Sequence, residues 1–372
     1  MIATRLRRRL RSVDRQLRMA RVVAKALASH QHPILAQIVP TRRCNLACGY
    51  CNEFDKVSAP VPLTKMLQRV DRLAALGTTM IDLSGGEPLL HPDLDAIIGR
   101  IRLHGIPSGL LTNGCLLTPG RIQRLNRAGL DRLQISIDNV VPDAVSHKSL
   151  KVLEQKLRWL ATYAEFDVNI NTVVGAGTRV PSDALEIARR ALALGFGTSV
   201  GLAHDGSGQV AALNADEQRV HEDILHLGRG FYSHAHDTLF QRQLRTGVPN
   251  LWHCRAGSRY LYVCEEGLVH WCSQQRGYPG IPLERYGAQD LEREYASVKS
   301  CAPRCTISCV HRVALLDDLR EKPFETLERL TTGEHTRFFT PPASVRLLTW
   351  MFVTSRQRAF FRRVARRALG AG

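Results

Sequence analysis

Short apolar runs alternate with longer amphipathic stretches between residues 34 and 203. Short runs of this kind are typical of buried strands, and the stretches between them repeat apolar residues at helical spacing. The pattern predicts six strands, at residues 34–39, 80–83, 108–112, 133–137, 168–174 and 198–202. It also predicts helices between them, at about 64–76, 92–104, 119–128, 149–164 and 182–194.

Six successive strand–helix units predict an α/β fold built on a partial (β/α)6 TIM-like barrel, with functional side chains where strands end and loops begin. Cysteines become frequent after about residue 250, where a β-hairpin is expected with strands at 260–263 and 268–271. The predicted domains are an N-terminal helix, the barrel, a small cysteine-rich extension made of a β-hairpin and a helix, and a helical tail: 1–33, 34–250, 251–315 and 316–372.

The formal charge of +17 is concentrated at the two ends of the chain. Residues 1–28 hold nine basic residues and one acidic residue, and residues 343–372 hold seven basic residues and no acidic one. The near-neutral body lacks the basic stripe expected of a nucleic-acid-binding protein. There is also no secretory signal and no long apolar span free of helix breakers, which predicts a cytoplasmic protein with reduced thiols.

Both ends are expected to form basic amphipathic helices. In the first, apolar residues recur at spacings of four and three: Leu6, Leu10, Val13, Leu17, Ala20, Ala24 and Leu27. In the tail, from Ser344 onward, apolar residues again stand among arginines. Two arrangements fit this pattern: attachment to an anionic membrane surface, which would make the protein a peripheral one, or packing on the barrel with the arginines facing water.

Three cysteines follow the first predicted strand as C-x3-C-x2-C, at Cys44, Cys48 and Cys51. Three thiolates on one short loop can ligate three corners of a 4Fe-4S cluster and leave the fourth iron without a protein ligand. From the spacing alone, a zinc site or three unrelated buried thiols are the alternatives.

A Gly-Gly-Glu-Pro turn, Gly85 to Pro88, follows the second predicted strand. Its glycines permit close backbone approach, and Glu87 can accept hydrogen bonds from an ammonium group. With the cysteine loop one strand earlier, the chain resembles the radical S-adenosylmethionine (SAM) superfamily. The pieces that carry the resemblance are CNLACGYC, the GGEP turn, LLTNG at 110–114, ISID at 135–138 and NINTVV at 169–174.

This resemblance implies that the three cysteines hold a 4Fe-4S cluster whose open iron is chelated by the methionyl amine and carboxylate of SAM. It implies a site for the methionyl amino group at Gly85, Gly86 and Glu87, an aromatic near the adenine at Tyr50, and contacts to the ribose at Ser136, Asp138 and Asn171. For Tyr50 the alternative is packing, for Ser136 and Asp138 it is a turn cap, and for Asn171 it is a purely structural role.

The resemblance also implies the chemistry. A low-potential donor of the flavodoxin or ferredoxin type would reduce the cluster, SAM would be cleaved to a 5′-deoxyadenosyl radical, and this radical would abstract hydrogen from a substrate carbon. The expected substrates are peptides, lipids or small natural products. The rival interpretation is a zinc-bearing, non-catalytic adaptor that binds nucleic acid or a membrane.

The spacing C-x12-G-x4-C from Cys254 through Gly267 to Cys272 is similar to the opening of the SPASM or twitch extension. A full SPASM extension contains a C-x2-C-x5-C-x3-C run, whereas here the later cysteines read C-x3-C-x3-C. This difference favours one auxiliary 4Fe-4S cluster, held by Cys254 and Cys272 with two or three of Cys301, Cys305 and Cys309. Cys264 is expected to be buried packing, and a zinc ribbon is the alternative for the group.

Overall fold

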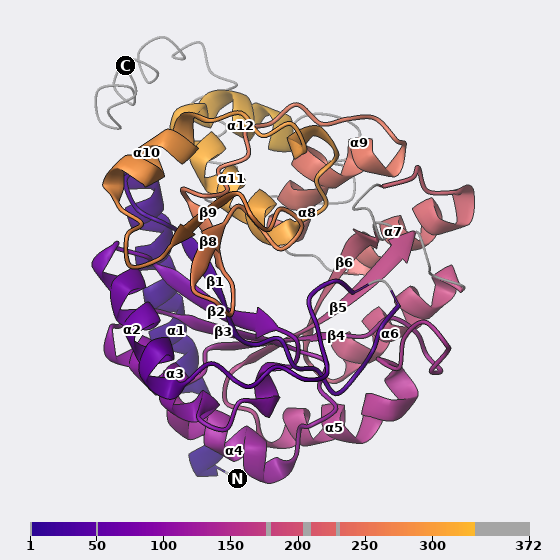
Figure 1. The fold of residues 1–372 in the computed structure, drawn as a ribbon. Helices are drawn as coiled ribbons and strands as arrows, with labels where there is room; N and C mark the ends of the chain where they lie inside the picture. The colour runs from indigo at the N-terminus through magenta and orange to yellow at the C-terminus, as the bar shows by residue number, and fades with distance from the viewer. Residues whose placement is uncertain (1, 50, 176–179, 204–209, 228–230, 332–372) are drawn as a thin grey trace.

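The computed structural model describes residues 2–49, 51–175, 180–203, 210–227 and 231–331. One nine-stranded sheet organises them, in the order β6-β5-β4-β3-β2-β1-β7-β8-β9, and it does not close on itself (Figure 1). Neighbouring strands from β6 through β1 to β7 are parallel, whereas β8 and β9 are antiparallel to their neighbours. The strands are β1 (Leu35–Thr41), β2 (Met80–Gly85), β3 (Ser108–Thr112), β4 (Arg132–Ser136), β5 (Asp167–Gly175), β6 (Gly197–Ala203), β7 (Tyr260–Val263), β8 (Leu268–His270) and β9 (Pro279–Pro282).

Five helices cover the outer side of this curved sheet (Figure 1). They are α2 (Leu63–Ala75), α3 (Leu94–Leu103), α4 (Pro119–Ala128), α5 (Leu150–Tyr163) and α6 (Pro181–Ala193). Two of them begin at capping hydroxyls, because Thr118 accepts a bond from the Arg121 amide and Ser149 one from the Val152 amide. The main apolar core lies between these helices and the strand side chains that point outward, such as Ile81 and Leu133.

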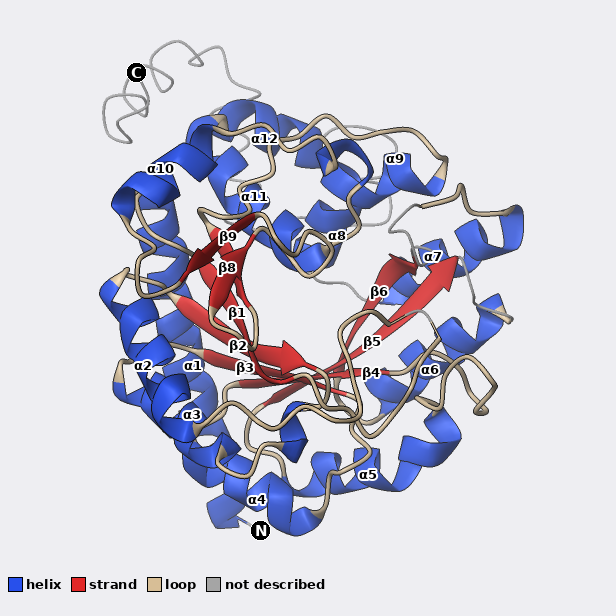
Figure 2. Cartoon of the chain, viewed as in Figure 1, coloured by secondary structure: helices blue, strands red, loops and turns tan. Residues whose placement is uncertain are grey.

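The remaining helices complete the ring on the side opposite the central strands (Figure 2). They are α7 (Ala215–Leu227), α8 (Phe231–His236), the π-helical turn η2 (Asp237–Gln241), α9 (Arg242–Arg245), α10 (Ala288–Ala296), α11 (Ser308–Glu321) and α12 (Pro323–Thr331). There are also two short 3-10 turns. The turn η1 (Pro88–Leu90) follows the two glycines Gly85 and Gly86, and η3 (Ala302–Arg304) follows Cys301.

The six barrel strands, the five helices between them and the hairpin are confirmed, each within two residues of its predicted ends. The sequence pattern missed the attachment of the hairpin: β7 pairs in parallel with β1, so the cysteine-rich extension continues the barrel sheet. The division into four domains remains a prediction. The helix predicted from Ser344 onward lies outside the described residues.

The N-terminal helix α1 (Ile2–Ala28) packs across the ends of the barrel helices, with several of its basic residues, among them Arg8, directed at the barrel. Arg11 donates to the carbonyl of Asn126 (2.7 Å), Arg15 pairs with Asp167 (2.6 Å), and Lys25 donates to the carbonyl of Gly77 (2.8 Å). Arg18 donates to the Asp131 carboxylate (2.9 Å) and is buried. The helix is confirmed, but the expectation that a barrel-packed helix would turn its arginines to water is wrong for these positions, because barrel carboxylates and carbonyls attract them.

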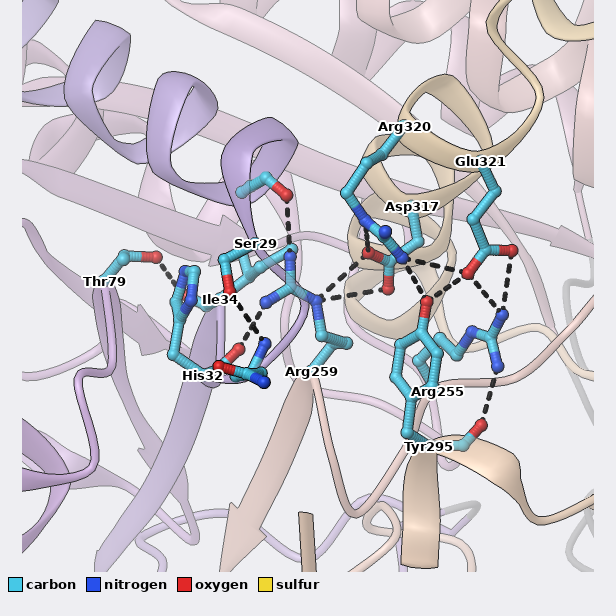
Figure 3. Close-up of polar contacts among 12 residues, drawn as sticks. Ser29, His32, Ile34, Thr79, Arg255, Arg259, Tyr295, Asp317, Arg320 and Glu321 are labelled. Carbon is cyan, nitrogen blue, oxygen red and sulfur yellow. Dashed lines mark hydrogen bonds and ion pairs between the residues drawn. The ribbon is translucent and has the colours of Figure 1, made fainter. Parts of the chain in front are cut away.

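A buried polar network joins α1 to the extension (Figure 3). The fully buried Arg259, just before β7, contacts both oxygens of Asp317 on α11 at 3.1 and 3.2 Å. Its other nitrogens donate to the carbonyls of Ala26 (3.0 Å) and His32. Arg255 likewise contacts both carboxylate oxygens of Glu321 through a single nitrogen, Nη2, at 2.9 and 3.0 Å. These bonds fix α11 against the start of the barrel sheet.

Within the described ranges, none of the helices combines the length and the apolarity needed to cross a bilayer.

Candidate functional site

The loop that carries the three cysteines begins directly after β1 and is closed at its base by backbone bonds. The amide of Cys44 donates to the carbonyl of Asp55 (3.0 Å), and the amide of Asp55 donates to the carbonyl of Arg42 (3.0 Å). Lys56 spans the loop by donating to the carbonyls of Cys44 (3.1 Å) and Leu46 (2.8 Å). The closure keeps all three thiols within one compact segment at the carboxyl end of β1.

The surroundings of the thiols combine burial with donors aimed at sulfur. Burial raises the pKa of Cys44 and of Cys51, which holds these thiols protonated until a metal replaces the proton. The amide of Leu46 points at the Cys44 sulfur (3.4 Å), and the Asn113 side-chain amide lies 3.8 Å from it. Contacts of this type stabilise a sulfur that has lost its proton, so the donor set fits thiolate ligation.

The Gly-Gly turn presses directly against the start of the cysteine loop. The amide of Gly86 donates to the carbonyl of Thr41 (3.0 Å), and the amide of Glu87 donates to that of Arg43 (2.9 Å). A Cβ at Gly86 would lie 2.2 Å from the Arg42 carbonyl oxygen, and Gly85 has a φ of +114°. Only glycines permit this approach, so the turn and the cysteine loop form one unit.

The Glu87 carboxylate has partners that the sequence did not predict. It is fully buried and accepts bonds from the Thr112 hydroxyl (2.7 Å) and from the amides of Asn113 (2.8 Å) and Leu89 (3.0 Å). Burial raises the pKa of this carboxyl, and these donors oppose the shift. Glu87 thus ties the turn after β2 to the end of β3, and its contact with an ammonium group remains a prediction.

The segment after β4 closes the site on another side. The amide of Gly49 donates to the carbonyl of Val145 (3.0 Å), and the Cys48 sulfur lies 3.8 Å from the Ser146 hydroxyl. Ser146 donates in turn to Asp138 (2.6 Å), whose carboxylate also pairs with Lys148 (3.1 Å). Asp138 is therefore placed beside the cysteine loop, but with protein partners of its own.

The two other predicted ribose contacts lie on neighbouring strands. Ser136 is half-buried at the end of β4 and pairs in register with Asn171 on β5. Asn171 accepts a bond from Ser199 on β6 (2.9 Å), and Ser199 accepts one from Asn169 (2.8 Å). The structure thus forms a polar row across β4, β5 and β6. The predicted adenine neighbour, Tyr50, lies outside the described residues.

The inner side of the sheet also carries an ion pair that the sequence pattern did not reveal. Asp82 on β2 pairs with Arg132 on β4 (2.8 Å) across Gly109 of β3. A Cβ at Gly109 would lie 2.0 Å from an Asp82 carboxylate oxygen, so the glycine makes room for the pair. The signal was a glycine in the middle of a predicted strand, which often marks the close approach of another group.

A second missed network joins the cysteine loop to the extension. Tyr262 on β7 donates to the carboxylate of Glu53, two residues after Cys51, and Arg276 lies 3.8 Å from the same carboxylate. Arg276 also binds Glu265 through two bonds of 2.8 and 2.9 Å. Burial raises the pKa of Glu53. The two cysteine-bearing parts of the chain therefore share one set of polar contacts.

The cysteines of the extension differ in the charged groups that affect the pKa of each thiol. Burial raises the pKa of Cys254 to about 11 and that of Cys272 to about 12. Burial also raises the pKa of Cys305, with Cys254, Cys272 and Cys301 among the neighbouring charges that raise it further. Burial also raises the pKa of Cys309, in the first turn of α11, where Asp82, Arg312 and Arg132 are the neighbouring charges that affect it. Cys309 nevertheless packs against the same apolar cluster that contains Cys254 and Cys272.

Two further cysteines lie near these groups. Cys264 is fully buried in the apolar cluster beneath the hairpin, as packing would require. Cys115, which the sequence analysis left aside, is half-buried next to Asn113, and the charges that affect its pKa include Glu87, Cys44 and Cys48. In the described ranges no three Cys, His, Asp or Glu side chains converge on a single-ion site, so the ligand sets remain predictions.

Comparison with known families and proteins gives consistent matches. The model of the Radical SAM superfamily matches residues 38–205. A PqqA peptide cyclase from Gluconobacter oxydans is 34% identical over 117 residues, which are 31% of this chain and 32% of that protein. A GTP 3′,8-cyclase from Synechococcus sp. is 39% identical over 127 residues, which are 32% of this chain and 36% of that protein. The match thus spans about a third of the length of these curated relatives.

Two solved structures share the fold over most of the chain. SuiB from Streptococcus suis, bound to its precursor peptide SuiA, aligns with a TM-score of 0.53 and 14% identity, covering 82% of this chain and 77% of that one. Native anSMEcpe with bound AdoMet and the Cp18Cys peptide aligns with a TM-score of 0.54 and 14% identity, covering 76% and 88%. At these identities the likeness concerns the fold alone.

Proposed function

We propose that the protein, whose residues 38–205 match the model of the Radical SAM superfamily, cleaves SAM reductively and removes a hydrogen atom from a substrate carbon. One observation carries this proposal: backbone bonds join the Gly-Gly turn to the cysteine loop, and the Glu87 carboxylate of the turn accepts bonds from Thr112 and Asn113 at the end of β3. A zinc-binding adaptor needs no such unit, whereas a cofactor held between a cluster and a glycine turn requires both to keep a fixed separation.

Cys44, Cys48 and Cys51 would hold the 4Fe-4S cluster, which supplies the electron for cleavage of SAM. The chain's own groups would then bind and orient. The close-packed Gly85–Gly86 backbone would receive the methionyl end, and the polar row at Ser136 and Asn171 would receive the ribose. The turn at Asp138, whose carboxylate Lys148 neutralises, would shape the pocket beside Cys48.

We further propose one auxiliary 4Fe-4S cluster in the extension, held by Cys254, Cys272, Cys301 and Cys305. Cys254, Cys272 and Cys301 are among the groups that raise the pKa of Cys305, which supports this set, and Cys309 would then be a half-buried thiol outside it. The shared contacts of Glu53 and Tyr262 would hold the two cluster-bearing parts in a constant relation.

A peptide is the substrate class that the comparisons favour. PqqA peptide cyclases are among the relatives, and two of the structures with the same fold hold peptides, SuiA and Cp18Cys. Lipids and small natural products are the other candidates. As partners we propose a flavodoxin- or ferredoxin-type electron donor and, through α1, an anionic membrane surface.

Anaerobic reconstitution tests the proposal. The account predicts a brown protein with about eight irons, in keeping with two 4Fe-4S clusters, that converts SAM to 5′-deoxyadenosine and methionine under reductant. The rival adaptor predicts a colourless protein with stoichiometric zinc and no SAM cleavage. Four irons with intact SAM cleavage would remove the auxiliary cluster and keep the central activity.

A further inference from the structure

Helix α1 buries Val22 and Ala26 against the protein but leaves other apolar residues facing water. An amphipathic helix on a globular protein normally turns its apolar residues to the core. Here Arg15 and Arg18 are turned to the barrel, while Val13 is 54% exposed and Leu17 is 58% exposed. The helix therefore packs on the barrel through arginines and, nearer its end, through Val22 and Ala26, and it leaves the stripe that contains Val13 and Leu17 uncovered.

The uncovered stripe continues along the helix. Ala20 and Ala24 are exposed at the next positions of the alternating four-and-three spacing, and Met19 and Val23 are 39% and 38% exposed beside them. We call the residues Val13, Leu17, Ala20 and Ala24 the α1 outer face. Arg21, which is exposed, borders it, whereas the ammonium group of Lys25 is held at the carbonyl of Gly77 (2.8 Å). The face thus combines apolar residues with a cation at their border.

Acidic charge is scarce on this helix. Arg102, near the end of α3, reaches Asp14 of α1 at 3.4 Å. Asp14 is the single acidic residue among residues 1–28, and it is engaged by Arg18 and Arg102. The outer face therefore has no acidic residue of its own helix available to repel an anionic surface.

The charge of the helix distinguishes the possible partners of the α1 outer face, which are a second copy of the protein, residues 343–372 and a membrane. A second copy would bring another segment with nine basic residues and one acidic residue against the first. Residues 343–372, with seven basic residues and no acidic one, would meet the same repulsion. An anionic bilayer is complementary, because its headgroups attract the exposed Arg21 and the net positive charge of residues 1–28, while its acyl boundary accepts the apolar stripe.

We propose that the α1 outer face binds the protein to an anionic membrane. The attachment has a direction, because the groups that α1 contacts lie at the amino ends of the strands: Asp131 precedes β4, Asp167 begins β5, and Gly77 precedes β2. The cysteine loop and the Gly-Gly turn lie at the carboxyl ends. The docked molecule therefore turns its candidate site away from the bilayer and, on the function proposed above, receives a substrate from solution rather than from within the membrane.

Vesicle flotation with the full-length protein tests this. Wild-type protein should float with vesicles of phosphatidylcholine and phosphatidylglycerol (3:1) and bind at least tenfold less to phosphatidylcholine alone. The double variant Val13→Ser/Leu17→Ser should lose at least tenfold in partition to the anionic vesicles. The matched control is Leu251→Ser/Val298→Ser, which alters two residues outside α1 that are 91% and 81% exposed. It should change the fraction of protein bound to the anionic vesicles less than twofold.

Three results would overturn the proposal: wild-type protein that stays with the unbound fraction, equal loss in both double variants, or an α1 variant that changes sedimentation from dimer to monomer without affecting flotation. Circular dichroism of the α1 variant must match wild type. Protein without iron should float equally well, so a failure here is distinct from a failure of SAM cleavage, which is measured on the reconstituted enzyme.

Discussion

Replacing Arg259 with Met is expected to destabilise the protein by about 4 kcal/mol. The side chain is fully buried and pairs with Asp317, which is 1% exposed. Breaking a buried pair by removing one partner costs about 3–5 kcal/mol. Arg320 remains 3.5 Å from Asp317, which favours the lower end of that range. The carbonyls of Ala26 and His32 each lose a donor, at roughly 0.5–1 kcal/mol apiece.

Urea unfolding followed by far-ultraviolet circular dichroism measures this loss. The matched control is Arg219→Met, because Arg219 and Asp216 form an exposed pair with side chains 68% and 74% accessible. Its free energy of unfolding should change by less than about 0.5 kcal/mol. The double variant Arg259→Met/Asp317→Leu should recover about 2 kcal/mol, since apolar replacement of both partners removes the unpaired charge. An Arg259→Met protein within about 1 kcal/mol of wild type would refute the reasoning.

Three further predictions concern the barrel, the extension and the pH dependence of stability. Gly109→Ala should displace Asp82 and lower the free energy of unfolding by about 2 kcal/mol in urea titration, whereas Gly120→Ala, where a Cβ meets open space, should not. Cys305→Ala should halve the iron content measured after reconstitution, and Cys309→Ala should leave it unchanged; equal losses would show that Cys309 is a ligand. Burial lowers the pKa of His32 to about 3, so protonation favours unfolding, and stability should fall as the pH drops below 6.5. The free energy of unfolding, from urea titrations at pH 7.5 and 5.5, should fall by about 1 kcal/mol less in His32→Gln than in wild type, and an equal fall in both proteins would contradict this.

The barrel could be predicted because its signals are local. Each strand is a short apolar run, and each helix is bounded by a cap or by a glycine such as Gly129, whose φ of +88° ends α4. The cysteine loop and the glycine turn could be found because their chemistry resides in adjacent residues. Their packing against each other follows from the parallel register of β1 and β2.

The remaining features depend on contacts between distant residues. The local sequence of neither strand indicates that β7 pairs with β1. The partners of Glu87 come from the end of β3, and the Glu53–Tyr262 contact spans 209 positions of the chain. The orientation of α1 was misjudged because amphipathicity shows that two faces differ, but not which face meets the barrel. The carboxylates at Asp131 and Asp167 decide that, and they lie more than a hundred residues away.

The formation of 5′-deoxyadenosine from SAM by the reconstituted, reduced protein tests the central claim most directly. Wild-type protein should form it, Ala replacements at Cys44, Cys48 and Cys51 should each abolish it, and Cys264→Ala, which alters a buried thiol outside both proposed ligand sets, should retain it. If the three variants still cleave SAM at the wild-type rate, the account of an open iron on the loop after β1 is contradicted.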